Sequence, residues 1–133
     1  MKFKKINILI TCSSGKFIYD IVKSLKEIKN LNVKIIGVDS CPKPNLVYLD
    51  KQYKIANCNN SKKYFKQLVT ICKKEKIKIA IPLSENETTL FSKKKYLLEE
   101  NKIKTLISNY TIVSNIVDKI KMFEFLERKK IDI

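Results

Sequence analysis

The order of the apolar segments constrains this chain more than any other feature, because short Ile-rich runs alternate with stretches of helical periodicity. The run 5–11, KINILIT, has the composition of a strand buried on both faces of a sheet. After a break at 12–15, apolar residues recur at helical spacing up to residue 28, and the run 33–38, VKIIGV, predicts a second strand. Strand, helix and strand together span about 33 residues, which is the size of a right-handed parallel crossover unit.

The remainder of the chain continues this alternation. The expected elements are a short strand at 53–56, a helix capped by Asn60-Ser61, a strand at 78–82, a helix through 90–98, a strand at 103–107, and two helices within 111–130 that meet near Asp118. Regular alternation predicts an α/β domain with a Rossmann-like parallel sheet and helices on both faces. Tyr64 and Phe65 fall on apolar helical positions, so we assign them to the core.

The formal net charge of +15 raises the question of an anionic partner. Of the 28 basic residues only Arg128 is arginine, although base readout and phosphate binding favour the forked guanidinium group. The lysines are spread along the chain, and abundant Lys, Ile and Asn are the residues that an A/T-rich genome encodes most often. We therefore expect no nucleic-acid partner and interpret the lysines as solvated surface residues.

Length and composition predict one cytoplasmic domain with a core of its own. The apolar runs are too short to span a bilayer, and the basic start lacks the apolar region of a signal peptide, so we expect no membrane contact. The four cysteines form no Cys-x-x-Cys pair and the chain has no histidine, which excludes the usual zinc sites and the catalytic dyads and triads that need an imidazole. We predict neither a metal site nor a catalytic residue within this chain.

A polar loop follows the first predicted strand, at the edge where parallel α/β sheets bind ligands. The backbone N–H groups of Ser13, Ser14, Gly15 and Lys16 are expected to point at the switch point of the sheet, where a helix start suits an anion or a carboxylate. The hydroxyl groups of the two serines would assist. A simple helix cap by one of these serines is the alternative interpretation.

Two further strand ends carry acidic residues. Asp39 ends the second strand, at the position of the ribose-binding acid in dinucleotide-binding folds. The fingerprint of those folds needs three glycines for the approach of the pyrophosphate, whereas the segment TCSSGK has one, so NAD binding is not expected. After the strand at 78–82, Ser84 precedes Glu85 and Glu87, whose carboxylates either face a ligand or complement the dipole of the next helix.

Several segments in a fixed order resemble a known domain. They are ILITxSxGK from residue 8, VKIIGVDS from residue 33, PxxVYLDKQYKIA from residue 44, ICKKEKIKIAIPLSENE from residue 71, and VDKIKMFEFLE from residue 117. Together they resemble the pre-ATP-grasp domain, which begins ATP-grasp enzymes related to the large subunit of carbamoyl-phosphate synthase. The resemblance covers the chain from Ile6 to Ile131.

The resemblance implies a sheet of about five parallel strands in the order 3-2-1-4-5 within residues 1–117, and a helix at 118–133 that leads toward an ATP-grasp domain. Family members clamp ATP and magnesium in that second domain and activate a carboxylate as an acyl phosphate, which an amine or another nucleophile then displaces. The first domain lines the acceptor-substrate side. Carried over, its substrate-binding residues are Ser13, Ser14, Gly15, Lys16, Asp39, Ser84, Glu85 and Glu87.

The same resemblance assigns the nucleotide side of the cleft. Lys119 corresponds to a basic residue that reaches an ATP phosphate in the family, and Asp118 would cap its helix. The other ATP-binding lysines and the magnesium ligands of the family lie in the ATP-grasp domain. We therefore expect the isolated chain to bind ATP weakly, to hold no cofactor tightly and to be inactive alone, as a cut fragment, a natural truncation or one subunit of a split enzyme.

Partners follow from these expectations. They are the ATP-grasp domain, a small-molecule acceptor substrate and, as a further possibility, a second copy of the chain. A helix cannot place Ile120, Met122, Phe123, Phe125 and Leu126 on one face, so we expect part of this set to be exposed. We expect either that a second copy of the chain or a crystal neighbour covers this patch, or that the helix is frayed. The alternative function is a stand-alone Rossmann-type module that binds a small molecule or a nucleotide.

Overall fold

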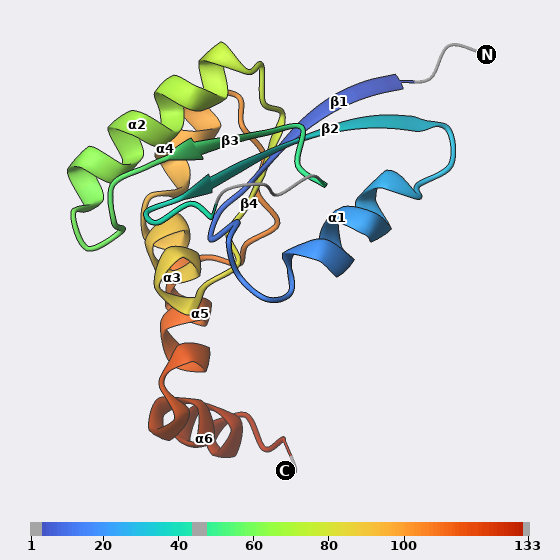
Figure 1. The fold of residues 1–133 in the computed structure, drawn as a ribbon. Helices are drawn as coiled ribbons and strands as arrows, with labels where there is room; N and C mark the ends of the chain where they lie inside the picture. Colours follow the sequence, from blue (N-terminus) through green and yellow to red (C-terminus); the bar gives the residue numbers. More distant parts are fainter. Residues whose placement is uncertain (1–3, 44–47, 132–133) are drawn as a thin grey trace.

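A computed structural model describes residues 4–43 and 48–131 (Figure 1). The strands and helices, in chain order, are β1 Lys4–Ile10, α1 Ile18–Lys26, β2 Leu31–Asp39, β3 Lys51–Lys54, α2 Ser61–Lys74, β4 Ile79–Ile81, α3 Glu85–Lys93, α4 Lys95–Glu100, α5 Tyr110–Val117 and α6 Lys119–Arg128. No helix in the described part of the chain is both long enough and apolar enough to cross a membrane.

The sheet has four parallel strands in the order β3-β2-β1-β4, so the predicted α/β class and the order of the first four strands are confirmed. The fifth strand, expected at 103–107, is reduced to one parallel bridge between Ile79 and Lys104. Lys104 N donates to Lys78 O, and Ala80 N donates to Lys104 O, each over 2.9 Å. The next donor along β4 would be residue 82. Because that residue is Pro82, which has no N–H, the ladder ends after one repeat.

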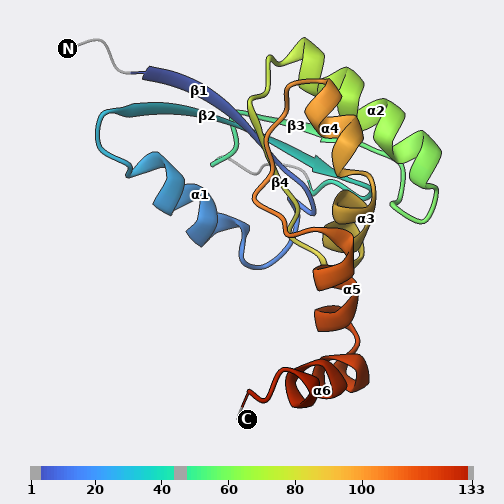
Figure 2. The same ribbon diagram turned by 180° about the vertical axis from the view of Figure 1, so that it is seen from behind.

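Helices cover both faces of the sheet, as predicted, with α1 on one face and α2, α3 and α4 on the other (Figures 1 and 2). The protein has one hydrophobic core on each face of the sheet, and successive residues of β1 point into them alternately. Ile8 and Ile10 pack with Ile18 and Val22 of α1, whereas Leu9 packs with the apolar residues of α2 to α4. This alternation is the period of two that a strand imposes on its side chains. The sheet is therefore buried on both sides.

Some element boundaries differ from the sequence-based expectation. α1 begins at Ile18, two residues after Lys16, and β3 occupies 51–54 instead of 53–56. The single helix expected through 90–98 is two helices, because the chain leaves helical geometry at Lys94, the C-cap of α3 and the N-cap of α4. Asn60 caps α2 by accepting a hydrogen bond from Lys63 N, as predicted.

The loop after β1 lies directly on β2, and this contact requires a glycine. A Cβ atom at Gly37 would lie 2.6 Å from Leu49 Cδ1 and 2.7 Å from the Cβ and Oγ atoms of Ser13. Because real Cβ contacts are longer than this, only glycine lets the buried Ser13 side chain sit against β2. The path of the chain from β1 toward α1 is thereby fixed.

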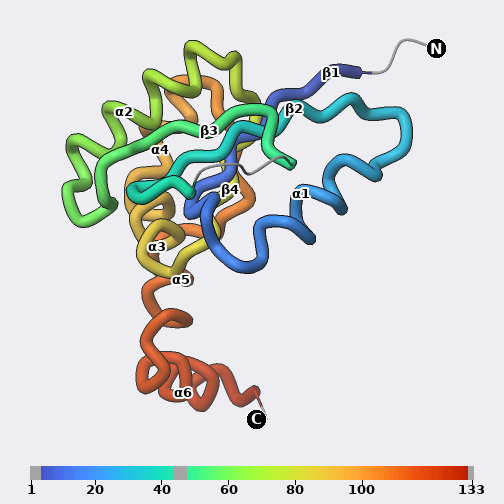
Figure 3. Tube along the Cα trace, viewed as in Figure 1, coloured from blue at the N-terminus to red at the C-terminus, as the bar shows by residue number. Residues whose placement is uncertain are grey.

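The last two helices extend away from the sheet, and α6 ends far from the start of β1 (Figure 3). α5 packs on α3, and α6 packs on α5. Asp118 begins α6 by accepting hydrogen bonds from the backbone N–H groups of Ile120 and Lys121, as predicted. α6 has no buried residue; Ile120 is 73% exposed and Phe123 is 48% exposed, so the expected exposure of this helix is confirmed.

Candidate functional site

A polar pocket of about 210 Å³ lies at the carboxyl ends of the strands. It is formed by the ends of β1 and β2, the segment after β3 and the first turns of α2 and α3. The lining residues are Cys12, Asp39, Ser40, Ile55, Ala56, Asn57, Cys58, Asn59, Tyr64, Ser84, Asn86 and Glu87. Two of them are acidic and none is basic, although the chain carries 28 basic residues.

Glu87 is the centre of this pocket and is only 7% exposed. Its Oε2 atom accepts hydrogen bonds from Thr11 Oγ1 over 2.7 Å and from Ser84 Oγ over 2.9 Å, and its Oε1 atom accepts one from Tyr64 Oη over 2.8 Å. A carboxylate offers about four acceptor positions, so three neutral hydroxyl groups leave one free on Oε1. In the described part of the chain no lysine or arginine forms an ion pair with Glu87.

The local sequence explains why Glu87 points inward. Ser84-Glu85-Asn86-Glu87 has the spacing of a helix capping box, and Ser84 Oγ accepts a hydrogen bond of 3.3 Å from Glu87 N at the start of α3. The same hydroxyl donates to the Glu87 carboxylate. Thr11, the residue directly after β1, joins this arrangement, because its Oγ1 atom accepts a hydrogen bond of 3.3 Å from Leu83 N. The loops after β1 and β4 are thus adjacent, as the sequence predicted.

The buried carboxylate changes the acidity of the groups around it. The pKa of the Tyr64 hydroxyl is raised, first by burial and then by the charge of Glu87. Burial also raises the pKa of the Cys12 and Cys58 thiols, and Glu87 adds to both effects. These pocket groups are therefore protonated and neutral at physiological pH, and the thiols are poor nucleophiles there.

The loop between β1 and α1 does not form the anion site predicted for it. Ser13 N donates to Val38 O over 3.2 Å, Ser14 N donates to the Asp39 carboxylate over 2.9 Å, and Gly15 N donates to Cys12 O over 3.0 Å. These three amides are used within the protein, so the prediction that they face a ligand is wrong. The alternative of a serine cap is also wrong, because the N-cap of α1 is Phe17, without a side-chain hydrogen bond.

Asp39 has two functions in the structure. Its Oδ2 atom accepts the hydrogen bond from Ser14 N, and its Oδ1 atom accepts one of 2.9 Å from Cys41 N, so the carboxylate joins the ends of β1 and β2. It also lines the pocket, where it adds a second negative charge to that of Glu87. Asp39 therefore fixes the loop after β1 to the end of β2 and makes the pocket more negative.

The structure brings together three of the eight residues predicted to bind substrate: Asp39, Ser84 and Glu87 line the pocket. The other five, Ser13, Ser14, Gly15, Lys16 and Glu85, do not line it. The Ser13 side chain is buried, and Gln52 Nε2 donates a hydrogen bond to its Oγ atom over 3.0 Å. Lys119, the predicted nucleotide contact, is exposed at the start of α6 and is not a pocket residue either.

Sequence reasoning missed the roles of Tyr64, which lines the pocket, and of Thr11, which lies outside the lining and donates a hydrogen bond to Glu87. Tyr64 was correctly assigned to the core, but its hydroxyl group is what reaches Glu87. A tyrosine in place of phenylalanine at a buried helical position is a usable signal, because a buried hydroxyl group needs a hydrogen-bond partner. Asn57, Cys58 and Asn59 follow β3 in a segment without periodicity, and no sequence pattern identifies them.

The pocket fits neither a triphosphate nor a magnesium ion. It has no lysine or arginine to neutralise phosphate oxygens, and the amides of the neighbouring loop are already bonded within the protein. Within the described residues no three acidic, cysteine or histidine side chains converge as metal ligands. The acidic, hydrogen-bond-accepting groups of the pocket instead suit a ligand that donates hydrogen bonds and carries positive charge.

Comparison with known proteins agrees with this architecture. Residues 8–107 match the protein family described as "PylC-like, N-terminal domain", a segment that runs from β1 past the bridge at Lys104 and ends before α5. A search of curated protein sequences finds no match.

Several solved structures share the fold. The L-amino acid ligase from Bacillus licheniformis superposes with a TM-score of 0.68 at 16% identity, over 96% of this chain and 31% of that protein. The biotin carboxylase subunit of a pyruvate carboxylase gives 0.62 at 16% identity, over 92% and 27%, and the biotin carboxylase domain of a thermophilic 2-oxoglutarate carboxylase gives 0.60 at 13% identity, over 93% and 28%. This chain thus spans less than a third of each of these proteins. Since the family match covers residues 8–107, which is more than half of the chain, the chain belongs to the PylC-like N-terminal domain family.

Proposed function

We propose that this chain forms the acceptor-substrate side of an ATP-dependent ligase and acts together with an ATP-grasp domain. ATP and magnesium, bound in that second domain, would supply the activation of a carboxylate as an acyl phosphate, as in carbamoyl-phosphate-synthase-like ligases. The residues of this chain would bind and orient the nucleophile and keep it out of bulk water. On this proposal the chain alone has no ligase activity and binds ATP weakly.

The observation that carries the proposal is the charge of the pocket. In a chain with a net charge of +15, the pocket at the ligand-binding edge of the sheet contains Asp39 and Glu87 and no basic side chain. A buried carboxylate without a cation is costly, so a ligand that neutralises it would bind favourably. A protonated amino group is such a ligand, and an amine is also a nucleophile that can displace an acyl phosphate.

The surrounding groups define how an amino group would be held. Glu87 Oε1 has one acceptor position left, and Asn57, Asn59 and Asn86 line the same pocket. These amides both donate and accept hydrogen bonds, so they can bind the polar groups next to the amine. At about 210 Å³ the pocket admits the amino end of a small molecule rather than a whole peptide.

The exposed helices at the end of the chain support a second part of the proposal. α5 and α6 carry exposed apolar residues, namely Ile112, Ile116, Val117, Ile120 and Phe123. Exposed apolar patches of this kind mark contact surfaces. We place the docking surface for the ATP-grasp domain here, with Lys119 at its edge as a contact to the nucleotide.

A titration of the isolated domain tests the pocket with a matched pair of ligands. L-alaninamide carries an ammonium group where L-lactamide carries a hydroxyl group. We expect L-alaninamide to bind with a dissociation constant of about 1 mM or weaker and to shift the backbone NMR signals of 57–59 and 84–87, while L-lactamide binds at least about tenfold more weakly.

Variants of the two neighbouring glutamates provide the control. Glu87→Gln should abolish the preference for L-alaninamide, whereas Glu85→Gln, an exposed residue on the same helix, should preserve it. Equal binding of the two amides to the unmodified domain, or tighter binding of inorganic triphosphate in this pocket, would refute an amine site.

A further inference from the structure

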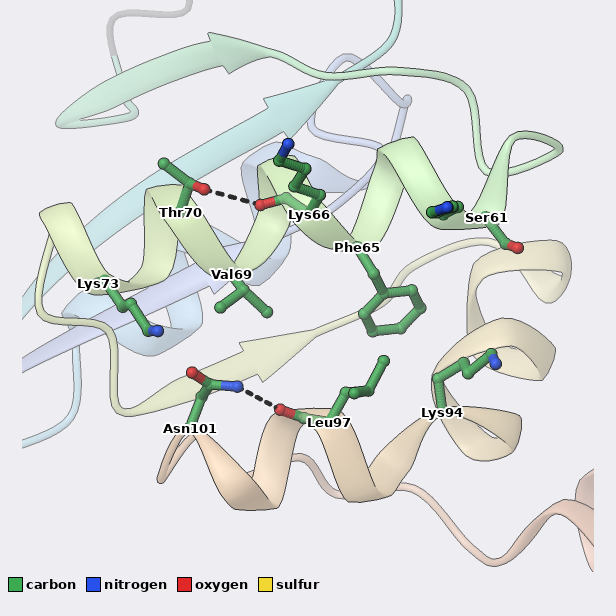
Figure 4. A pocket seen from close by; sticks show the side chains of 10 residues that line it. Ser61, Phe65, Lys66, Val69, Thr70, Lys73, Lys94, Leu97 and Asn101 are labelled. Carbon is green, nitrogen blue, oxygen red and sulfur yellow. Dashed lines mark hydrogen bonds between the residues drawn. The ribbon is translucent and has the colours of Figure 1, made fainter.

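A second hollow, of about 580 Å³, lies along α2 and shares no lining residue with the polar pocket. It is a groove between α2 and α4, shown in Figure 4. Phe65, Val69 and Leu97 point toward one another across its floor. The remaining lining residues are Ser61, Lys62, Lys66, Thr70, Lys73, Lys94 and Asn101.

The groove follows the periodicity of its two helices. On α2 the lining positions 62, 66, 69 and 73 form one stripe with helical spacing. Position 97 of α4, together with its N-cap 94 and its C-cap 101, forms another. In Figure 4, Lys73 and Asn101 lie at one end of the groove, and Ser61 and Lys94 lie at the other. The result is an apolar strip between two helices with positive charge at both ends.

The charge of the groove is not neutralised by the chain. Four of its ten lining residues are lysines and none is acidic. In the part of the chain that the structure describes, none of these lysines takes part in an ion pair. A third hollow, of about 480 Å³, lies next to the groove on α2 and shares Lys66 with it; Lys54 and Lys63 also contribute, and none of its lining residues is acidic. Positive charge therefore extends from the groove over the neighbouring surface of α2.

We propose that the groove between α2 and α4 docks an acidic amphipathic helix of a partner protein. A helix placed over the strip would bury apolar residues on Phe65, Val69 and Leu97 and direct its carboxylates at the lysines on the rim. Charge complementarity of this kind steers association and sets the register of a helix in its groove. The site is independent of the amine pocket and of the helices assigned to the ATP-grasp domain.

The same features disfavour other anionic partners. Nucleic-acid surfaces that bind single strands present aromatic faces to the bases, whereas Phe65 is buried and forms part of the floor. No arginine lines the groove, so the forked contacts to phosphate or guanine are missing. A membrane surface is flat on this scale, whereas the apolar strip is recessed between two helices. The apolar side chains of the groove therefore cannot insert into a bilayer.

The test uses a synthetic peptide of about four helical turns, with leucines at i, i+3, i+4 and i+7 and glutamates on the opposite face. A scrambled peptide of identical composition is the matched control, since it keeps the charge and loses the apolar stripe. We expect fluorescence anisotropy to give at least about tenfold tighter binding for the amphipathic peptide than for the scrambled one.

Two charge-reversed variants locate the site. Lys66→Glu combined with Lys94→Glu should weaken binding of the amphipathic peptide by at least about tenfold, and Lys23→Glu combined with Lys29→Glu, on exposed residues at α1 and the turn after it, should leave it within about threefold although the net charge changes equally. Val69→Ser, which removes apolar surface without changing charge, should also weaken binding. Circular dichroism confirms that each variant is folded.

Three results would overturn the proposal. Equal affinity for the two peptides would mean general attraction to a basic protein. Equal loss in the two charge-reversed variants would place the contact outside the groove. Tighter binding of single-stranded DNA or of vesicles that contain anionic lipid, with the same sensitivity to Lys66 and Lys94, would assign the groove to a different class of partner.

Discussion

Glu75 and Glu87 are each 7% exposed, but their partners differ. Glu75 lies at the C-cap of α2, where Lys51 Nζ is 2.8 Å from its Oε1 atom, Lys34 Nζ is 2.9 Å from its Oε2 atom, and Tyr53 Oη donates to it as well. Glu87 has only neutral hydroxyl donors. One buried carboxylate is thus paired with cations, and the other is not.

The difference separates a structural site from the proposed binding site. The two ammonium groups neutralise Glu75, and their contacts join α2 to β2 and β3. Hydrogen bonds from Lys51, Tyr53 and Lys34 lower the pKa of the Glu75 carboxyl to about 2. Removal of one partner of a buried ion pair strongly lowers the stability of the folded protein. Glu87 has no such neutralisation, so its charge is available to a ligand in the pocket.

The largest expected effect is the loss of stability in Glu75→Gln. The substitution leaves Lys34 and Lys51 without a counter-charge and removes charge-assisted hydrogen bonds between α2 and two strands. Because both lysines are partly exposed, solvent offsets some of this loss, and we expect the free energy of unfolding to fall by about 2 kcal/mol. Urea denaturation measures it, with the exposed Glu99→Gln as control. A change as small as that of the control would break the comparison.

The second effect is a dependence of stability on pH. The pKa of Glu75 in the folded protein, about 2, lies below the ordinary value of 4.5, so its contribution is complete above about pH 4.5 and is lost as the pH falls toward about 2. Denaturation curves between about pH 6 and about pH 3 should therefore show a decline that is shallower in Glu75→Gln. Parallel declines in the two proteins would show that other carboxylates cause the acid sensitivity.

The smallest expected effect is the change in stability of Glu87→Gln. The amide oxygen can accept hydrogen bonds on one side, and a hydroxyl group on the other side can rotate to accept one from the amide nitrogen. The substitution also removes the cost of a buried charge without a cation. We expect a change of less than about 1 kcal/mol in the free energy of unfolding. Thermal unfolding of the ligand-free protein is a sufficient measurement. A loss equal to that of Glu75→Gln would make Glu87 a structural residue and remove the basis of the amine site.

The sequence predicted most of the fold because the fold depends on apolar periodicity. The core residues of β1, β2 and α2 could be recognised from their spacing, and so could the caps Asn60 and Asp118. The truncated fifth strand could not, although its cause is local: Pro82 removes one donor, and the register that makes this donor decisive exists only in the folded sheet.

The candidate site was predicted less completely, because hydrogen bonds between distant segments determine it. Glu87 and Ser84 stand in one recognisable motif, but Thr11 reaches Glu87 across 76 positions of the chain. Conversely, the amides of Ser13 and Ser14 looked available in the sequence and are occupied by β2 residues in the structure. Glu75 gave no signal either, since it stands in a lysine-rich helix end that is typical of a solvated surface.

The short ladder at Pro82 also affects how copies of this domain can associate. At one side of the sheet the pairing of β4 ends after a single bridge, and at the other β3 is four residues long with an exposed lysine at each end. Short outer strands, proline and lysine all hinder the addition of a strand from another molecule. Strand-by-strand aggregation of this domain is therefore disfavoured, and its natural contacts should be made by helices.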